Sequence, residues 1–169
     1  MKNSLQIIII SIVLLSIVSC SIYSFGGVTL DSRVKTIQID RFPNNAPLVE
    51  PSLSSKFTND LKDLFDSQAN LEMVNNNGDI YFEGEITGYR INPMTATAQQ
   101  TAAQSRLTIT VMVHYTNKYE EDKGFDQSFS FYHDFDSNTN LVGGALDEAL
   151  EVIFDRITQD IFNASVAQW

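Results

Sequence analysis

In residues Gln104–Asn117, QSRLTITVMVHYTN, apolar side chains occupy every second position from Leu107 to Tyr115, and all but Met112 of the residues between them are polar. Because successive side chains of a strand point to opposite faces, this alternation predicts a β-strand with one buried face. The side chains assigned to the buried face are Leu107, Ile109, Val111, Val113 and Tyr115. Such a strand needs neighbours that continue the sheet and a second layer that covers its apolar face, so it decides the kind of fold.

Residues 79–91 and 125–135, on either side of this strand in the sequence, show the same alternation. In the first of them, Ile80, Phe82 and Ile86 take the apolar face, whereas Tyr81, Glu83, Glu85, Thr87 and Tyr89 take the polar face. In the second, phenylalanines alternate with aspartates and serines. Three consecutive strands with one apolar face predict an antiparallel meander that buries one side.

The remaining segments supply the second layer. Residues 52–68 and 142–167 repeat apolar side chains at spacings of three and four, which predicts two amphipathic helices. Residues 34–42 alternate and predict an opening strand, and residues 71–74 suit a short one. A strand that is followed by a helix can pair parallel to a later strand.

These elements predict an α+β, two-layer sandwich, with two long helices packed on one face of a mixed, mostly antiparallel four- to five-stranded sheet. The length of 169 residues suits a single domain, and 43% hydrophobic residues supply a core and argue against disorder. The 11 basic and 21 acidic residues give a net charge of −10, which argues against nonspecific binding to nucleic acid or to an anionic lipid surface.

The first twenty residues have the pattern of a lipoprotein signal peptide. A short basic start is followed by an apolar run from residue 5 to residue 18 and then by Ile17-Val18-Ser19-Cys20. That run is shorter than a typical membrane-spanning helix and fits a signal peptide. An aliphatic residue, a small residue and then cysteine form a lipobox, so we expect cleavage before Cys20 and lipidation of its thiol. The alternative is a plain signal peptide or anchor followed by a buried cysteine.

Few residues point to catalysis or to a metal. His114 is expected on the polar sheet face, and His133 half-buried near a strand end. Asp134, Asp136, Asn138 and Asn140 alternate like the start of an EF-hand loop, but Thr139 stands where glycine is needed and Ala145 where glutamate is needed. We therefore expect residues 136–140 to form a turn and the N-cap of the last helix, and we expect no metal and no cofactor.

Glu83 and Glu85 share a predicted strand face about 7 Å apart, a spacing that two carboxylates need for acid–base chemistry. One alternative function is therefore a periplasmic hydrolase that uses these glutamates or His133, which requires a closed pocket around them. A solvated sheet face explains the same residues, and we expect a protein that is not an enzyme.

Several segments of the mature chain together resemble LptE-type lipopolysaccharide-assembly lipoproteins, in the branch found in Bacteroidota-like bacteria. They are the lipobox with Tyr23-Ser24-Phe25, VKTI at 34–37, FPN at 42–44, APLV at 46–49, FEGEITGY at 82–89, AQSRLTITV at 103–111, FDQSFS at 125–130 and DIFN at 160–163.

The resemblance implies three regions: a signal peptide over residues 1–19, a lipidated tether over residues 20–31 and a single LptE-like domain over residues 32–169. It implies a periplasm-facing lipoprotein that is anchored in the outer membrane through its N-terminal lipid. Ser21 favours this membrane, since aspartate after the lipidated cysteine often marks inner-membrane retention.

The resemblance also implies a function and its partners. Such a protein plugs and chaperones an LptD-type β-barrel, with the loop at 92–101 and the polar face against the barrel wall, and it assists lipopolysaccharide transport. By charge and by position near strand ends, Arg90, Arg106 and Lys118 are the candidates for contact with lipopolysaccharide phosphates. The alternative partner is another envelope transporter or secretion channel, for which the chain would be an auxiliary or adaptor subunit.

Overall fold

The computed structural model describes residues 30–47, 50–94 and 103–166. The expected signal peptide, Cys20, most of the tether, and most of the loop at 92–101 lie outside these residues. The described elements are the strands β1 (Thr36–Ile39), β2 (Glu72–Met73), β3 (Ile80–Pro93), β4 (Gln104–Asn117) and β5 (Phe125–Asp136), the helices α2 (Leu53–Gln68) and α3 (Gly144–Ser165), and the short 3-10 helix η2 (Glu121–Lys123). None of the helices described is long and apolar enough to span a bilayer.

The strands form one mixed sheet in the order β2-β1-β3-β4-β5. β1 pairs parallel to both β2 and β3, whereas β3, β4 and β5 pair antiparallel. Beyond β1 the chain stays beside β3, where the Pro43 carbonyl accepts the Ile86 N–H at 2.9 Å. The predicted meander, the parallel opening strand and the short strand are therefore confirmed.

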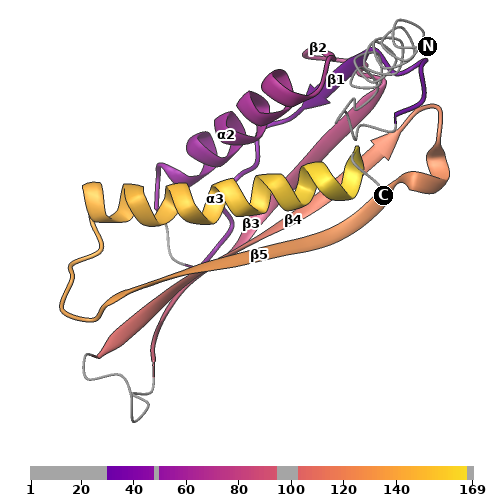
Figure 1. Cartoon of the computed structure of the whole chain (residues 1–169). Helices are drawn as coiled ribbons and strands as arrows, with labels where there is room; N and C mark the ends of the chain where they lie inside the picture. The colour runs from indigo at the N-terminus through magenta and orange to yellow at the C-terminus, as the bar shows by residue number, and fades with distance from the viewer. Residues whose placement is uncertain (1–29, 48–49, 95–102, 167–169) are drawn as a thin grey trace, which may run out of the picture.

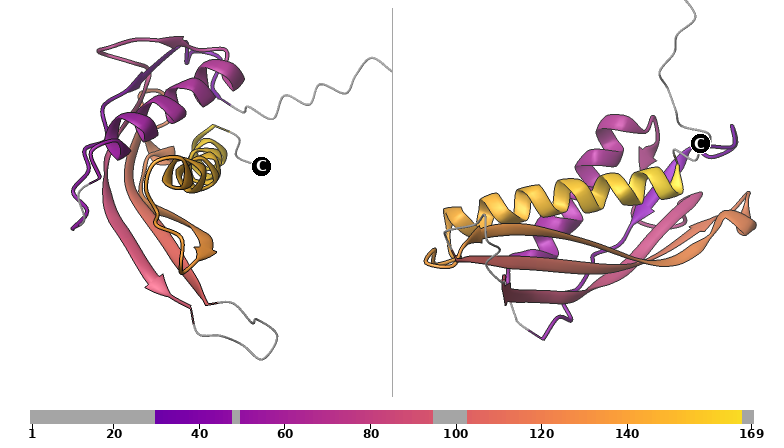
Figure 2. Two further views of the ribbon diagram at one scale, coloured as in Figure 1. Left: turned by 90° about the vertical axis from the view of Figure 1, so that its left-hand side faces the viewer. Right: turned by 60° about the horizontal axis from the view of Figure 1, so that its bottom comes forward.

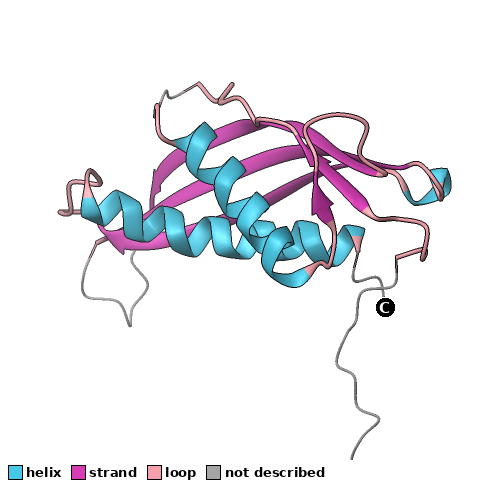
Figure 3. Cartoon of the chain, turned by 90° about the horizontal axis from the view of Figure 1, so that it is seen from above, coloured by secondary structure: helices cyan, strands magenta, loops and turns pink. Residues whose placement is uncertain are grey.

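Both helices cover the same face of the curved sheet (Figures 1 and 2), which confirms the predicted two layers. Seen from above, α3 runs along the strands beside β5, and α2 lies at an angle to it (Figure 3). The β3–β4 hairpin extends beyond the helices at the lower left of Figure 1. The opposite face of the sheet carries no second layer of described residues.

Aromatic rings join the two layers. Two contacts link α2 to α3, with ring centroids 5.3 Å apart for Phe57 and Phe154 and 5.1 Å apart for Phe65 and Phe162. Phe65 also contacts Phe82 of β3 at 5.0 Å. From there a row of rings crosses the sheet through Tyr115 to Phe125 and Phe129. The core is therefore one continuous cluster between sheet and helices.

A β-bulge interrupts the alternation of β3. Ile86 pairs with Val111 but Gly88 pairs with Thr110, so Thr87 is an extra residue in β3. The bulge exchanges the two faces for the rest of the strand. Tyr89 is therefore buried at 6% exposure, and the expectation that it shares the exposed face with Tyr81 was wrong.

The start of α3 is the second correction. Residues 136–140 do form a turn, in which the Asp136 carbonyl accepts the Thr139 N–H at 2.8 Å. The helix begins later, at Gly144, and its N-cap is Gly143 with a positive φ of 55°. Asn140 therefore does not cap the helix, because residues 141–143 extend the connection and only glycine adopts this φ without strain.

Candidate functional site

The uncovered face of the sheet carries most of the candidate functional side chains that the sequence predicts, namely Glu83, Glu85, Arg90, Arg106 and His114. Hydroxyl groups of Thr108, Thr110 and Ser130 occupy its middle, and Thr110 and Ser130 are hydrogen-bonded to each other at 3.0 Å. Acidic groups and His114 lie toward the β1 end, whereas arginines lie toward the tip of the β3–β4 hairpin. The face is thus mostly polar, although the side chains of Met112 and Tyr132 are also exposed on it.

Arg106 lies near the hairpin tip and is fully engaged. Its guanidinium donates two hydrogen bonds to the Asp134 carboxylate, at 2.6 and 2.8 Å, and stacks over the Tyr132 ring at 3.5 Å. These hydrogen bonds raise the pKa of Arg106 and lower that of Asp134. Because the Asp134 carboxylate balances its charge, Arg106 is better suited to shaping this end than to capturing an anion.

Arg90 lies at the same end and is free to act on a ligand. It is exposed and makes no ion pair with the described residues. It lines a shallow pocket of about 400 Å³ with Thr87, Gly88, Thr108 and Thr110. A Cβ at Gly88 would stand 3.1 Å from the Thr110 side chain, so glycine keeps the floor of the pocket open. A guanidinium beside hydroxyl groups is a combination that binds phosphate or another oxyanion.

Lys118 lies at the opposite end of the sheet. Ile80 pairs with Asn117, and Arg90 pairs with Thr108, so ten strand residues, about 33 Å, separate Lys118 from Arg90. The Lys118 ammonium lies 3.8 Å from the Asp79 carboxylate. The structure therefore brings Arg90 and Arg106 to one end of the sheet and does not bring Lys118 to them.

The two predicted glutamates line an open basin of about 420 Å³ near β1. The Tyr81 hydroxyl lies 2.8 Å from the Asp40 carboxylate and 2.9 Å from that of Glu83. Burial and these two contacts raise the pKa of Tyr81. Glu85 accepts a hydrogen bond from Asn45. Both glutamates are therefore held by neighbours on an open polar face, not in the closed pocket that a hydrolase requires.

Neither histidine completes a catalytic arrangement. His114 contacts Asp126 across β4 and β5 on the exposed face, and Glu83 is its cross-strand neighbour on the other side. His133 is half-buried near the end of β5, as expected, on the helix-facing side. The described residues contain no group of acidic or histidine side chains arranged to hold a metal ion.

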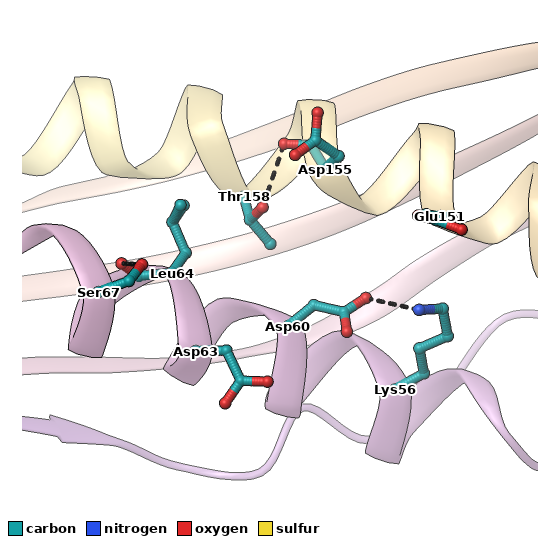
Figure 4. Close-up of a pocket in the computed structure, with 8 residues that line it drawn as sticks. All are labelled: Lys56, Asp60, Asp63, Leu64, Ser67, Glu151, Asp155 and Thr158. Atoms are coloured by element: carbon teal, nitrogen blue, oxygen red, sulfur yellow. Dashed lines mark hydrogen bonds and ion pairs between the residues drawn. The ribbon is translucent and has the colours of Figure 1, made fainter.

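A groove of about 500 Å³ lies between α2 and α3 (Figure 4). The sequence did not predict it. Four of its eight lining residues are acidic, and a fifth is Lys56, whose ammonium lies 3.0 Å from the Asp60 carboxylate. Figure 4 shows Asp63 on α2 and Glu151 and Asp155 on α3. Periodicity could not show that the two helices would place these carboxylates along one groove.

Comparisons with known proteins agree with the fold. The model of the family LptE, Lipopolysaccharide-assembly, matches residues 34–165. No curated protein matches the chain significantly. A minor lipoprotein from Acinetobacter baumannii has the same fold, with 10% identity and a TM-score of 0.50 over 76% of this chain and 89% of the other. A hypothetical protein from Chlamydia trachomatis shares 8% identity, with a TM-score of 0.52 over 79% of this chain and 99% of the other.

Proposed function

Because this chain belongs to the LptE family of lipopolysaccharide-assembly proteins, we propose that it is a lipid-anchored, non-enzymatic partner of an LptD-type β-barrel. In this role it plugs and chaperones the barrel and assists delivery of lipopolysaccharide to the outer membrane. The observation that carries the proposal is the family match over residues 34–165, which includes every described strand and helix.

The proposed anchor is a lipid on Cys20, the only cysteine of the chain. Several acyl chains would hold the protein firmly on the membrane, since each buried CH₂ contributes about 0.8 kcal/mol. The described fold begins at residue 30 next to β1, so ten residues join it to the lipid and span at most about 36 Å. The anchor thereby concentrates the domain at the mouth of a barrel in the same membrane.

The polar sheet face supports contact with the wall of a wet barrel lumen. Its hydroxyl groups suit direct or water-mediated hydrogen bonds, which are abundant in polar interfaces. The face is broad and has no second layer of its own among the described residues, so a barrel wall can approach it.

Within this role, Arg90 is the residue proposed to contact a lipopolysaccharide phosphate. It is exposed, it lines the threonine pocket and it makes no ion pair with the described residues, whereas Arg106 is engaged with Asp134. Binding must be local, because a net charge of −10 opposes broad attraction to anionic lipid.

A charge reversal tests this contact. Arg90→Glu should weaken binding of purified lipopolysaccharide about tenfold, the effect of losing one charge-assisted hydrogen-bond pair. Lys118→Glu is the matched control, because it reverses the same charge at the far end of the sheet and should leave affinity nearly unchanged. Equal losses in both variants would show that net charge, and not the Arg90 pocket, governs binding.

Depletion of the protein tests the function as a whole. The expected result is loss of lipopolysaccharide from the cell surface together with loss of the correctly assembled barrel, measured by surface labelling and by barrel heat-modifiability. Normal lipopolysaccharide export in depleted cells would refute the proposed function.

A further inference from the structure

The outer edge of β5 is a long unpaired strand edge among the described residues. β5 is the last strand of the sheet and pairs only with β4, in one uninterrupted register from Tyr115↔Phe125 to Gln104↔Asp136. Proteins usually protect such an edge with charged side chains, above all lysine, with a proline, a bulge or a short strand, or by covering it with a helix or loop. β5, FDQSFSFYHDFD, has aspartates near its ends, but its middle, residues 127–132, contains no charged residue or proline and shows no register shift against β4.

The register identifies which backbone groups are unpaired. The Ser137 N–H donates to the Ala103 carbonyl at 3.0 Å, and these two residues continue the β4–β5 register. In an antiparallel pair every second residue bonds to the partner, so the odd-numbered residues of β5 point their N–H and C=O groups to β4. The even-numbered residues, including Ser128, Ser130 and Tyr132, therefore point theirs outward.

The helix-facing side of the same edge is incompletely covered. Phe129 is buried, but Phe125, Phe131 and Phe135 are only partly buried on that side. On α3, Val152 is 43% exposed, and the Arg156 guanidinium lies 5.8 Å from the centre of the Phe131 ring. A further strand beside β5 would cover these phenylalanines with its own inward side chains.

We infer that this edge accepts an extended strand from another protein, which adds to the sheet beside β5 as a sixth strand. Backbone hydrogen bonds to the even-numbered residues would hold it, and its alternate side chains would give specificity. Its inward side chains would be aliphatic, to cover Phe131 and Val152. Its outward side chains would be threonine or serine in the middle and lysine or arginine toward the ends, opposite Asp126 and Asp136.

Charge argues against a second copy of this chain as the occupant. Of the two antiparallel registers that overlap nearly all of β5 with itself, one places Asp126 opposite Asp136, and the other places it opposite Asp134, whose charge Arg106 balances. Like charges directly opposite each other destabilise a strand pair. The chain as a whole is also strongly acidic, at −10. The inference does not depend on the proposed function, since it rests on the β5 edge and not on the family match.

The test uses the full-length lipoprotein in detergent and a synthetic peptide as long as β5. The peptide alternates valine with threonine and has lysine at the outward positions near both ends. We expect binding below about 1 mM and an increase of about tenfold in the amide-exchange protection of Ser128, Ser130 and Tyr132, while Phe129 and Phe131 change little.

Two matched controls separate strand addition from charge attraction. The same peptide N-methylated at alternate residues keeps its charges but cannot pair, so its affinity should fall about tenfold or more. Ser128→Pro removes one outward N–H at an edge position where proline is tolerated. It should weaken peptide binding as strongly as N-methylation of the peptide does. Ser128→Thr keeps the N–H and should not weaken binding. Thermal unfolding of both variants verifies that the fold is kept.

The inference fails if the unmodified peptide does not bind at that concentration, or if N-methylation and Ser128→Pro have no effect. A dimer of the free protein that Ser128→Pro abolishes would also overturn it, because the edge would then be occupied by a second copy. Lipopolysaccharide export is not a readout here, so this failure is distinguishable from failure of the proposed function.

Discussion

Individual polar groups in and near the core each change the free energy of unfolding by a measurable amount. The hydroxyl of Tyr115 is fully buried and has no hydrogen-bond partner among the described residues. Burial raises the pKa of Tyr115 to about 12, so the hydroxyl stays neutral at physiological pH. An unsatisfied buried hydroxyl costs about 1–3 kcal/mol.

Tyr115→Phe should therefore raise the free energy of unfolding by about 1 kcal/mol. The ring contacts to Phe82 and Phe125 remain in the variant, because only the hydroxyl is removed. Urea unfolding at neutral pH measures the change. A clear loss of stability would show that the hydroxyl is satisfied in solution.

Asp79 joins the start of β3 to the start of β1. Its carboxylate accepts the backbone N–H groups of Lys35 at 3.0 Å and Thr36 at 3.1 Å. The hydrogen bond from Lys35 is the largest cause that lowers the pKa of Asp79. A carboxyl with a lowered pKa in the folded state stabilises the fold above its ordinary pKa of 3.8, and this stability is lost as the pH falls below that value.

Asp79→Asn should cost about 1–2 kcal/mol at pH 7 and should lose less stability than the parent as the pH falls from about 4 to about 2. Denaturant unfolding over that pH range is the measurement. Asp66→Asn, an exposed position of α2 outside the groove, is the control and should change stability at pH 7 by less than about 0.5 kcal/mol. An Asp79→Asn variant with the parent's stability and pH dependence would contradict the assigned role of Asp79.

At the scale of elements, one glycine sets the distance between β3 and the segment after β1. A Cβ at Gly84 would overlap the Met112 carbonyl oxygen and would lie 2.6 Å from the Phe42 ring. Gly84→Ala should therefore destabilise the fold by about 3 kcal/mol or more, measured by chemical unfolding.

Gly144→Ala is the matched control for that substitution. Nothing lies within 4 Å of a Cβ at Gly144, which begins α3, so alanine should be neutral or slightly stabilising. If both alanine variants lost stability equally, the close packing at Gly84 would not be the cause.

The elements also show how far sequence patterns reach. Alternation predicted β4 to the residue, because five buried apolar side chains repeat without interruption from Leu107 to Tyr115. In β3 the same reasoning placed Tyr89 on the wrong face. A single extra residue, Thr87, exchanges the faces, and no feature of the sequence before it distinguishes this bulge from a continuing strand.

At the scale of the whole molecule, the sequence predicted the layers but not the sites. Two apolar helices and one apolar sheet face can satisfy one another only by stacking, so the sandwich followed from periodicity. The separation of Lys118 from Arg90 depends on strand register, and the groove between α2 and α3 depends on how the helices lie against each other. Neither is encoded in a local pattern.

The anchor is a further prediction at this scale. Cys20→Ser should release the protein from the membrane to the soluble fraction or leave it uncleaved, because the thiol is the atom expected to carry the lipid. Membrane fractionation and intact mass spectrometry measure the outcome. An unmodified Cys20 thiol on a membrane-bound parent protein would contradict the lipoprotein assignment.

Affinity purification of the lipidated protein from outer membranes, with identification of its stoichiometric partner, tests the central claim most directly. The account predicts a complex with one large LptD-type β-barrel that withstands detergent. Recovery of the chain alone, or in a stoichiometric complex with a different envelope transporter or secretion channel, would contradict it.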